Sequence, residues 1–260
     1  MQRLDFYFAT YNRYSAPITD HSFLLRCMPQ DLPEQRISDL HLTILPKPLG
    51  DSPGKDSFGN VTYEGRLPEG HDHLRYVVRG TAIRDDTMRT CCKPMDCYRY
   101  PSGLTQPSPA LAELAATVPN DGTPLEQAWG MAMAAHESIC YTPNVTNVHT
   151  TADQALRQGH GVCQDYTNVF LALCRIRRLN VRYVSGIPLG EGPSHAWGEV
   201  WQEGFWYGID PTRACRADET YIKLCCGRDF ADCPIEVGVF RGLNSQEQRV
   251  YSRVSLSDVK

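Results

Sequence analysis

Three short segments in the second half of the chain carry side chains that could act together in covalent catalysis. Cys163 stands in the segment GVCQDY, His195 in SHAW and Asp210 in GIDPT. A thiol can attack a carbonyl carbon, an imidazole can accept and return the proton, and a carboxylate can hold the imidazole in the required tautomer. In this order, the three residues are interpreted as a nucleophile, its base and the group that orients the base.

Cys163 is predicted to stand at the start of a helix. Apolar residues recur at helical spacing between residues 163 and 179, which is typical of an amphipathic helix. The first turn of a helix has free N–H groups and the positive end of the helix dipole, and both favour a thiolate. The backbone N–H of Cys163 is also suitably placed to bind the oxyanion of a tetrahedral intermediate.

His195 and Asp210 are expected on the two strands of a hairpin. Its turn places Trp201 opposite either Phe205 or Trp206. When Trp201 pairs with Trp206, His195 and Asp210 are diagonal neighbours on one face, about 7–8 Å apart at the backbone. That separation allows the carboxylate to accept one imidazole N–H, which leaves the other ring nitrogen for the thiol.

Each of these residues also has an ordinary structural explanation. A cysteine in a helix is more often a packing residue, and Cys174 in the same predicted helix is assigned to the core. A histidine at a strand start is usually a surface or core residue, and Asp210 before Pro211 could serve only to start a turn. The presence of all three in suitable settings favours the catalytic interpretation.

Composition restricts the class of protein. The chain has 260 residues, 42% hydrophobic residues and a net charge of −4. No apolar run is long enough to span a bilayer and no basic stripe is present, so neither a membrane nor a nucleic acid is expected as a partner. Residues 1–8 lack a signal-peptide pattern, which predicts a cytoplasmic location. The sequence gives no indication of the oligomeric state.

The eleven cysteines are many for a cytoplasmic chain. Most are expected to be reduced, because disulfides are rare in that compartment. The clusters at 91–97 and 225–233 lack the C-x-x-C spacing of structural zinc sites. They are expected to be small buried hydrophobic residues, and no metal or other cofactor is predicted.

The chain is predicted to fold as two units, residues 1–105 and 106–260. The first contains short strand patterns separated by turn signals, which are typical of an all-β, sandwich-like domain. A segment rich in proline, glycine and serine ends it near residue 105. In the second unit, helices are expected at 109–118, 123–139, 151–159 and 163–179, followed by strands at 180–186, 194–201, 205–209, 237–241 and 249–254.

The segments around the three residues resemble the core of bacterial transglutaminase-like cysteine proteases. The likeness includes GVCQDY, RYVSG, SHAWGEV and DPT, and it extends to residues 227–242 and to 58–60 and 73–74 in the N-terminal unit. It implies an α+β fold: a papain-like transglutaminase core, with the nucleophile's helix packed on an antiparallel sheet, preceded by an amino-terminal all-β module. It also implies acyl transfer, with Cys163 as nucleophile, His195 as general base and acid, and Asp210 as the orienting residue.

Further residues are candidates for the oxyanion hole or the substrate cleft. They are Gln164, Tyr141, Trp197 and Ser194. Some relatives use an aromatic donor upstream of the nucleophile, a role open to Tyr141 and Trp129, although such residues more commonly pack in the core. Thr167 and Asn168 are expected to make the cleft wall more polar than in relatives.

Three functions are compatible with these residues. The favoured one is a cysteine peptidase or amidase that hydrolyses a peptide or isopeptide bond of a peptide or protein substrate through an acyl-enzyme on Cys163. A protein-glutamine transglutaminase would form the same acyl-enzyme and transfer the acyl group to an amine. A non-catalytic binding module would keep the fold, but inactive relatives typically lose a member of the triad, and all three are present.

Overall fold

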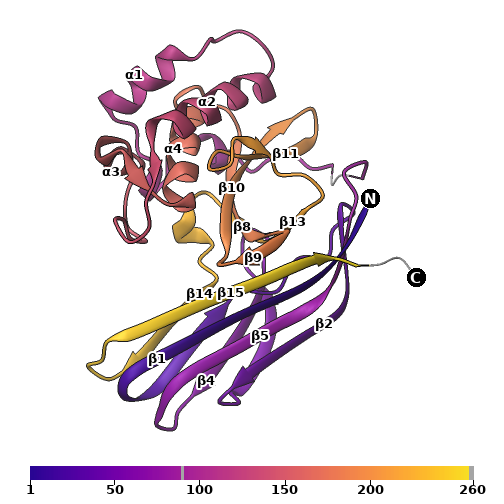
Figure 1. The fold of residues 1–260 in the computed structure, drawn as a ribbon, viewed down its shortest axis with the longest axis vertical. Helices are drawn as coiled ribbons and strands as arrows, with labels where there is room; N and C mark the ends of the chain where they lie inside the picture. The colour runs from indigo at the N-terminus through magenta and orange to yellow at the C-terminus, as the bar shows by residue number, and fades with distance from the viewer. Residues whose placement is uncertain (89–90, 258–260) are drawn as a thin grey trace.

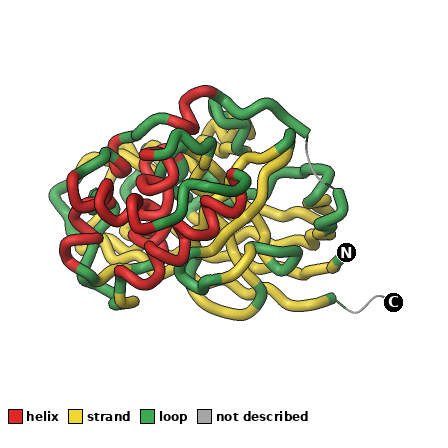
Figure 2. Tube along the Cα trace, turned by 90° about the horizontal axis from the view of Figure 1, so that it is seen from above, coloured by secondary structure: helices red, strands yellow, loops and turns green. Residues whose placement is uncertain are grey.

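The computed structural model describes residues 1–88 and 91–257, which form two lobes (Figure 1). Long strands build one lobe, and helices with a smaller sheet build the other. Seen from above, the helices gather on the side of the molecule away from both chain ends (Figure 2). The fold class is α+β, as predicted, with helices packed on an antiparallel sheet and a β-rich N-terminal region.

The lobe of long strands is a sheet of eight strands within the described residues, called here the N-terminal sheet. Its strands are β1 (Gln2–Leu25), β2 (Gln35–Leu45), β3 (Leu49–Lys55), β4 (Val61–Leu67), β5 (His71–Arg84), β9 (Gly190–Gly192), β14 (Glu236–Arg241) and β15 (Gln246–Leu256). β1 is central: its first half pairs with β5 and β15, and its second half pairs with β4 and β14. Leu4, Phe6 and Phe8 are buried while Arg3 and Asp5 are exposed, so the two-residue period directs one face of β1 into the core.

The C-terminal strands return to the N-terminal sheet. β15 runs antiparallel to β1, from Leu4 opposite Leu256 to Tyr14 opposite Gln246. Residues 236–256 therefore pair with the first strand of the chain, although the sequence patterns placed them with the second unit. β9 also pairs with β15, which anchors the segment that leads to His195. The division near residue 105 stays a prediction, but strands from both sides of it share one sheet.

The other lobe consists of four helices and a five-stranded sheet within the described residues, called here the core sheet. The helices are α1 (Pro109–Thr117), α2 (Pro124–Ser138), α3 (Ala152–Gln158) and α4 (Cys163–Ile176). The core sheet has the order β12 (Cys215–Arg216), β11 (Phe205–Asp210), β10 (His195–Gln202), β8 (Val181–Pro188) and β13 (Tyr221–Gly227). A short parallel pair, β6 (Cys140–Tyr141) and β7 (His160–Gly161), lies beside α4.

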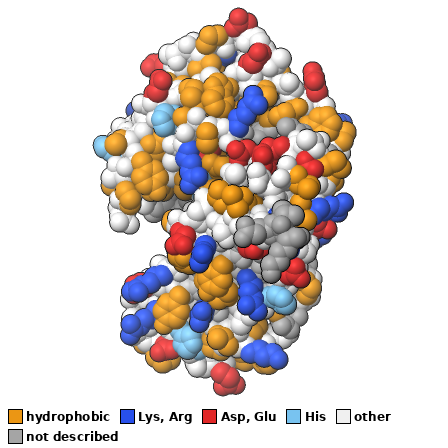
Figure 3. Space-filling view, turned by 45° about the vertical axis from the view of Figure 1, so that its right-hand side comes forward, with side chains coloured by type: hydrophobic (Ala, Val, Ile, Leu, Met, Phe, Trp, Pro, Cys, Tyr) orange, Lys and Arg blue, Asp and Glu red, His pale blue; other side chains and the backbone are white. Residues whose placement is uncertain are grey.

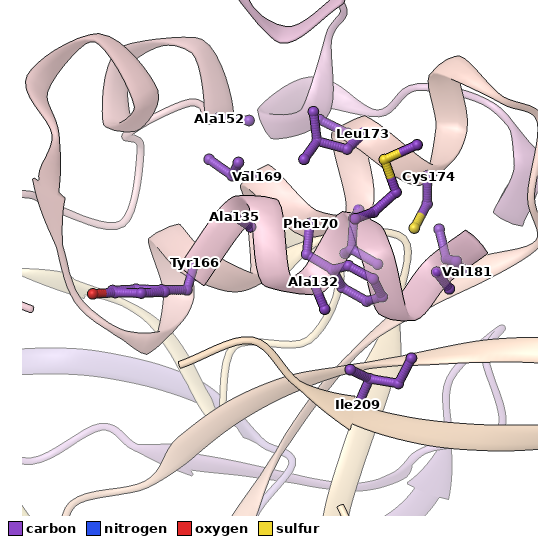
Figure 4. Packing of buried hydrophobic residues seen from close by; sticks show 14 of the residues in the cluster. Ala132, Ala135, Ala152, Tyr166, Val169, Phe170, Leu173, Cys174, Val181 and Ile209 are labelled. Atoms are coloured by element: carbon purple, nitrogen blue, oxygen red, sulfur yellow. The ribbon is translucent and has the colours of Figure 1, made fainter. Parts of the chain in front are cut away.

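Helix α4 is the centre of this lobe. Every residue from Asp165 to Arg175 is buried. Phe170 lies beside Ala132 of α2 in this core, and both lie on one side of the strand that carries Ile209 (Figure 4). A Cβ atom on Gly198 of β10 would lie 2.3 Å from the Phe170 ring, so a glycine at this position allows the helix to pack closely on the sheet.

The predicted helices are all present, with ends that differ by at most three residues. Thr123 and Thr151 are the N-caps of α2 and α3, and each forms a capping box with the residue three positions further along. Strand β13 was not predicted, because Lys223 interrupts the apolar pattern that a fully buried strand normally shows. Within residues 1–88 and 91–257, no helix is long and apolar enough to cross a membrane.

Strand β13 connects the two lobes through polar side chains. The amide of Gln35 accepts from Lys223 N (2.8 Å) and donates to Lys223 O (2.9 Å), as a neighbouring strand would. Asn60 does the same with Cys226, at 2.8 and 2.7 Å. Both amide side chains are fully buried, so they satisfy backbone groups of β13 that would otherwise lack partners.

Candidate active site

Helix α4 begins at Cys163 because the side chain of Asp165 caps its first turn. The carboxylate of Asp165 accepts hydrogen bonds from Val162 N (2.8 Å) and from the Thr146 hydroxyl (2.7 Å). A Cβ atom on Gly161 would lie 2.6 Å from Asp165 Oδ2, so the close approach of the chain requires glycine. Cys163 is partly exposed. Its thiol is therefore held at the positive end of a buried helix, within reach of solvent.

His195 and Asp210 form a close pair across the hairpin of β10 and β11. The register places Trp201 opposite Trp206, which is the second of the two registers considered from the sequence. The imidazole Nε2 lies 2.7 Å from Asp210 Oδ2. Burial disfavours the imidazolium, but the hydrogen bonds of His195 to Asp210 and to Cys163 outweigh it and raise the pKa of His195 to about 9. At neutral pH the thiol therefore faces a protonated imidazole.

Asp210 is fully buried and has several donors. Its Oδ1 accepts from Thr212 N (2.9 Å) and Arg213 N (3.1 Å), and its Oδ2 accepts from the Tyr221 hydroxyl at 2.9 Å. Burial alone would raise the pKa of this carboxyl group, but His195 and these donors hold it below its usual value. Asp210 is thus a charged, fixed acceptor for the imidazole.

Tyr221 is the residue of this site that sequence reasoning missed. It opens β13, and its ring packs edge-on against Trp197, with centroids 5.3 Å apart. Its hydroxyl also lies 3.5 Å from the Sγ atom of Cys215. Since β13 was not recognised as a strand, nothing in the sequence placed this tyrosine opposite Asp210.

Tyr141 and Gln164 lie next to the thiol. Tyr141 is 53% exposed and belongs to β6, which pairs with the segment just before Cys163. Burial of its hydroxyl and the neighbouring Cys163 raise the pKa of Tyr141. Gln164 follows the nucleophile on α4, and its Nε2 lies 3.4 Å from Asn147 O. Both side chains can therefore contact a substrate bound at Cys163.

The other cleft candidates differ in their burial. Ser194 is partly exposed and directly precedes β10. Trp197 is only 2% exposed, and its ring packs against that of Tyr221, so little of it is available to a substrate bound at Cys163. Trp129 is partly buried and packs against the hydrophobic cluster around α4.

The expectation of a more polar cleft wall at Thr167 and Asn168 is wrong. Both residues are fully buried within α4. The hydroxyl of Thr167 donates to the carbonyl oxygen of Cys163 at 2.8 Å, which satisfies a polar group inside the helix. The two residues follow the nucleophile on the side of the helix that packs inside the lobe.

The cysteine clusters are only partly as expected. All eleven cysteines lie in the described residues, and each is a free thiol. Cys225, Cys226 and Cys233 are buried, but Cys91 is exposed and Cys97 is partly exposed, because their segment runs over the surface between β5 and α1. Within residues 1–88 and 91–257, no group of three or more His, Cys, Asp or Glu side chains is arranged to hold a metal ion.

Comparison with known proteins agrees with this fold. Residues 112–211 match the model of the Transglutaminase-like superfamily, and residues 6–82 match that of the Bacterial transglutaminase-like N-terminal region. A crystal structure from Cytophaga hutchinsonii, of a protein named as a proposed cysteine protease, matches this chain with a TM-score of 0.82. It is 18% identical, and the match covers 100% of this chain and 92% of that one. At this identity the likeness concerns the fold.

Two curated mycobacterial proteins are also similar, and both are uncharacterized. One from Mycobacterium leprae is 29% identical over 165 residues, which are 60% of this chain and 59% of that protein. One from Mycobacterium tuberculosis is 28% identical over 261 residues, covering 85% of this chain and 82% of the relative. The fold and the two matched regions define a transglutaminase-like protein. The chain contains a transglutaminase-like core at residues 112–211 and a bacterial transglutaminase-like N-terminal region at residues 6–82.

Proposed function

We propose that this protein is a thiol acyl-transfer enzyme that hydrolyses a peptide or isopeptide bond through an acyl-enzyme on Cys163. One observation carries the proposal: the imidazole of His195 is hydrogen-bonded on one side to the buried carboxylate of Asp210 and interacts on the other with Cys163. This is the relation of nucleophile, base and orienting group that acyl transfer requires.

The proposed reaction has two steps. The thiolate of Cys163 attacks the carbonyl carbon, and the oxyanion binds the unpaired N–H groups of the first turn of α4. The imidazolium of His195 gives its proton to the leaving amine, so the C–N bond breaks and a thioester forms. His195 then takes a proton from water, which attacks the thioester and releases the acid.

The exposure of the nucleophile favours water over an amine as the acceptor. Cys163 is partly exposed, so solvent reaches the acyl group, whereas transfer to an amine needs a site that excludes water. Hydrolysis is therefore proposed as the main outcome, and transfer to an amine is the alternative that the experiment must separate from it.

The test is mass spectrometry of a peptide library incubated with the wild-type protein and with Cys163→Ala, each with and without an added primary amine. Cleavage by the wild type alone, with few amine-substituted products, is expected. Products that carry the amine in place of water would instead establish a transglutaminase. Equal turnover by Cys163→Ala would contradict both.

A further inference from the structure

Arg213 is a cation at the catalytic site to which the proposed reaction gives no role. It follows Asp210 by three residues, and its backbone N–H donates to Asp210 Oδ1 at 3.1 Å. Its guanidinium lies over the ring of Tyr221, with Cζ 5.8 Å from the ring centroid, and its Nη1 is 3.5 Å from the Tyr221 hydroxyl. Residues of the site therefore hold both the backbone and the side chain of Arg213.

The guanidinium of Arg213 has donors to spare. Its side chain is 48% exposed, and among the described residues its one ion pair is with Asp210, at 3.9 Å between Nε and Oδ2. That oxygen already accepts from His195 at 2.7 Å and from Tyr221 at 2.9 Å. A guanidinium has five N–H donors in a planar fork that matches a carboxylate. Arg213 can therefore bind a carboxylate of a bound molecule through two hydrogen bonds.

Arg213 and the nucleophile have a common neighbour, Tyr141. Burial and the nearby Cys163 raise the pKa of Tyr141, whereas the guanidinium of Arg213 lowers it. Arg213 is also linked to Cys163 through Asp210 and then His195. Three or four extended residues of a peptide span about 10–14 Å. A peptide whose carbonyl carbon lies at Cys163 can therefore contact Arg213 within a few residues of that carbonyl.

The catalytic residues themselves carry no excess of positive charge. The imidazolium of His195 is bonded to the carboxylate of Asp210, and the nucleophile is a thiolate. The chain has a net charge of −4, and on the face shown in Figure 3 the Lys and Arg side chains are interspersed with Asp and Glu. The field of the whole molecule therefore does not attract anions. A preference for an anionic substrate would have to come from Arg213.

We propose that Arg213 gives this site a preference for peptides that carry a carboxylate within a few residues of the bond that Cys163 attacks. The carboxylate belongs to an Asp or Glu side chain or to the C-terminus of the peptide. This inference rests on the proposed function, because it names the class of substrate for that reaction. A carboxylate forms charge-assisted hydrogen bonds with the guanidinium, which a neutral amide does not. Because Arg213 is half exposed, the preference is expected to be about fivefold and to weaken with salt.

The first test is a competition between matched peptides, with the wild-type protein at low salt. The peptide library is made in pairs that differ at one position, Glu against Gln, and each pair is made with an amidated and with a free C-terminus. Mass spectrometry of the mixture gives the ratio of kcat/KM for two peptides directly. Peptides with Glu, or with a free C-terminus, close to the cleaved bond should be cleaved about fivefold faster than neutral ones. The amidated Glu peptides and the free-acid Gln peptides separate the two sources of the carboxylate.

Two results of this competition would count against the proposal in different ways. Equal cleavage of neutral and anionic peptides would overturn the preference and leave the proposed function intact. Cleavage of none of the peptides by the wild type would overturn the proposed function, and the preference with it.

The second test asks whether Arg213 causes the preference. Arg213→Gln keeps the backbone N–H that binds Asp210; it should raise KM about fivefold for anionic peptides and change the cleavage of neutral peptides far less. Arg213→Lys should keep part of the preference, because it keeps the charge but not the planar fork. Arg216→Gln, which removes an exposed arginine from β12, is the matched control and should keep the whole preference.

The kinetics of Arg213→Gln decide between a contact with the substrate and an effect on Asp210 alone. If this variant slows neutral and anionic peptides equally, or shifts the pH–rate profile for both, Arg213 acts only through Asp210 and the proposal is wrong. A preference that persists unchanged in the folded variant, checked by circular dichroism, would overturn it as well. If the variant does not fold, the competition between matched peptides and its loss at high salt still decide.

Discussion

The hydroxyl of Tyr221 and the imidazole of His195 both donate to the same oxygen, Oδ2 of Asp210, at 2.9 and 2.7 Å. The tyrosine thus helps to hold the carboxylate in place through the same oxygen that the imidazole binds. Its pKa is raised by burial and by the charge of Asp210, so it stays a hydroxyl donor over the working pH range. It is a positioning residue, because it acts on the imidazole through Asp210.

Replacing Tyr221 with phenylalanine should reduce kcat/KM by about tenfold, since hydrogen bonds to charged groups contribute about 1.5–3 kcal/mol. Without the competing donor, Asp210 interacts more strongly with the imidazolium, so the alkaline limb of the pH–rate profile should move to higher pH. A purely structural role would leave that limb where it is. Tyr11→Phe, at an exposed position, is the matched control and should keep wild-type kinetics.

The raised pKa of His195 predicts where activity ends on the alkaline side. Because the imidazolium supplies the proton for the leaving amine, kcat/KM should fall as the pH rises through about 9. In Asp210→Asn the charged acceptor is gone, and the limb should move to lower pH. Initial rates from pH 5 to pH 10 check both; an identical alkaline limb in the two proteins would contradict the pairing.

The same pKa shift makes folding stability depend on pH. The pKa of His195 is about 9 in the folded protein and about 6.5 in an unfolded chain. The imidazolium therefore stabilises the fold fully below about pH 6.5, and this contribution is lost as the pH rises through 9. Urea unfolding of the wild type should show this decline, and His195→Ala should show less of it.

A buried charge cluster in the core sheet predicts unequal effects of two substitutions. Glu199 is 7% exposed and binds both Lys223 Nζ (2.8 Å) and Arg182 NH2 (2.5 Å). Although burial opposes its charge, Arg182 and Lys223 bring the pKa of Glu199 to about 2. Glu199→Gln should cost about 3–5 kcal/mol of unfolding free energy, because two buried cations lose their carboxylate. Lys223→Met should cost less, because Arg182 still neutralises Glu199.

Those two free energies are measurable by urea denaturation followed by tryptophan fluorescence. The order of the two variants is the decisive result. If the Glu199→Gln protein is as stable as the Lys223→Met protein, the buried Arg182 and Lys223 do not depend on the Glu199 carboxylate for their stability, which would contradict this prediction.

The contact between Gly198 and Phe170 predicts the effect of a single added methyl group. Gly198→Ala places a Cβ atom 2.3 Å from the ring beneath α4, and overpacking of this kind costs about 1–3 kcal/mol. Gly103→Ala is the control, since a Cβ atom there meets nothing within 4 Å. Thermal unfolding should separate the two variants, and equal midpoints would contradict the close packing of α4 on β10.

The sequence predicted the elements that have local signals. Thr123 and Thr151 are typical N-cap residues and indicated the starts of two helices, and the spacing of apolar residues after Cys163 indicated the helix of the nucleophile. For the hairpin, the sequence left two registers, with Trp201 opposite either Phe205 or Trp206. The choice matters because a shift of one residue moves His195 to the other face of the sheet.

Features that depend on long-range pairing could not be predicted. β13 carries Lys223, whose burial is possible only because Glu199 on another strand neutralises it. β14 and β15 pair with β1, so residues more than 200 positions apart in the sequence are neighbours in one sheet. No local sequence pattern predicts such a contact. Tyr221 was missed for this reason. Thr167 was wrongly expected in the cleft wall, because the side of α4 that faces the interior is determined only by how the helix packs.

The proposed reaction requires that Cys163 forms an acyl-enzyme. Intact-protein mass spectrometry after a rapid acid quench, with an activated ester or a cleavable peptide as acyl donor, tests it most directly. One acyl adduct on Cys163 is expected in the wild type and in Cys91→Ala, which removes an exposed thiol, and none is expected in Cys163→Ala. An adduct of equal yield in Cys163→Ala, or turnover of the donor by that variant at the wild-type rate, would contradict it.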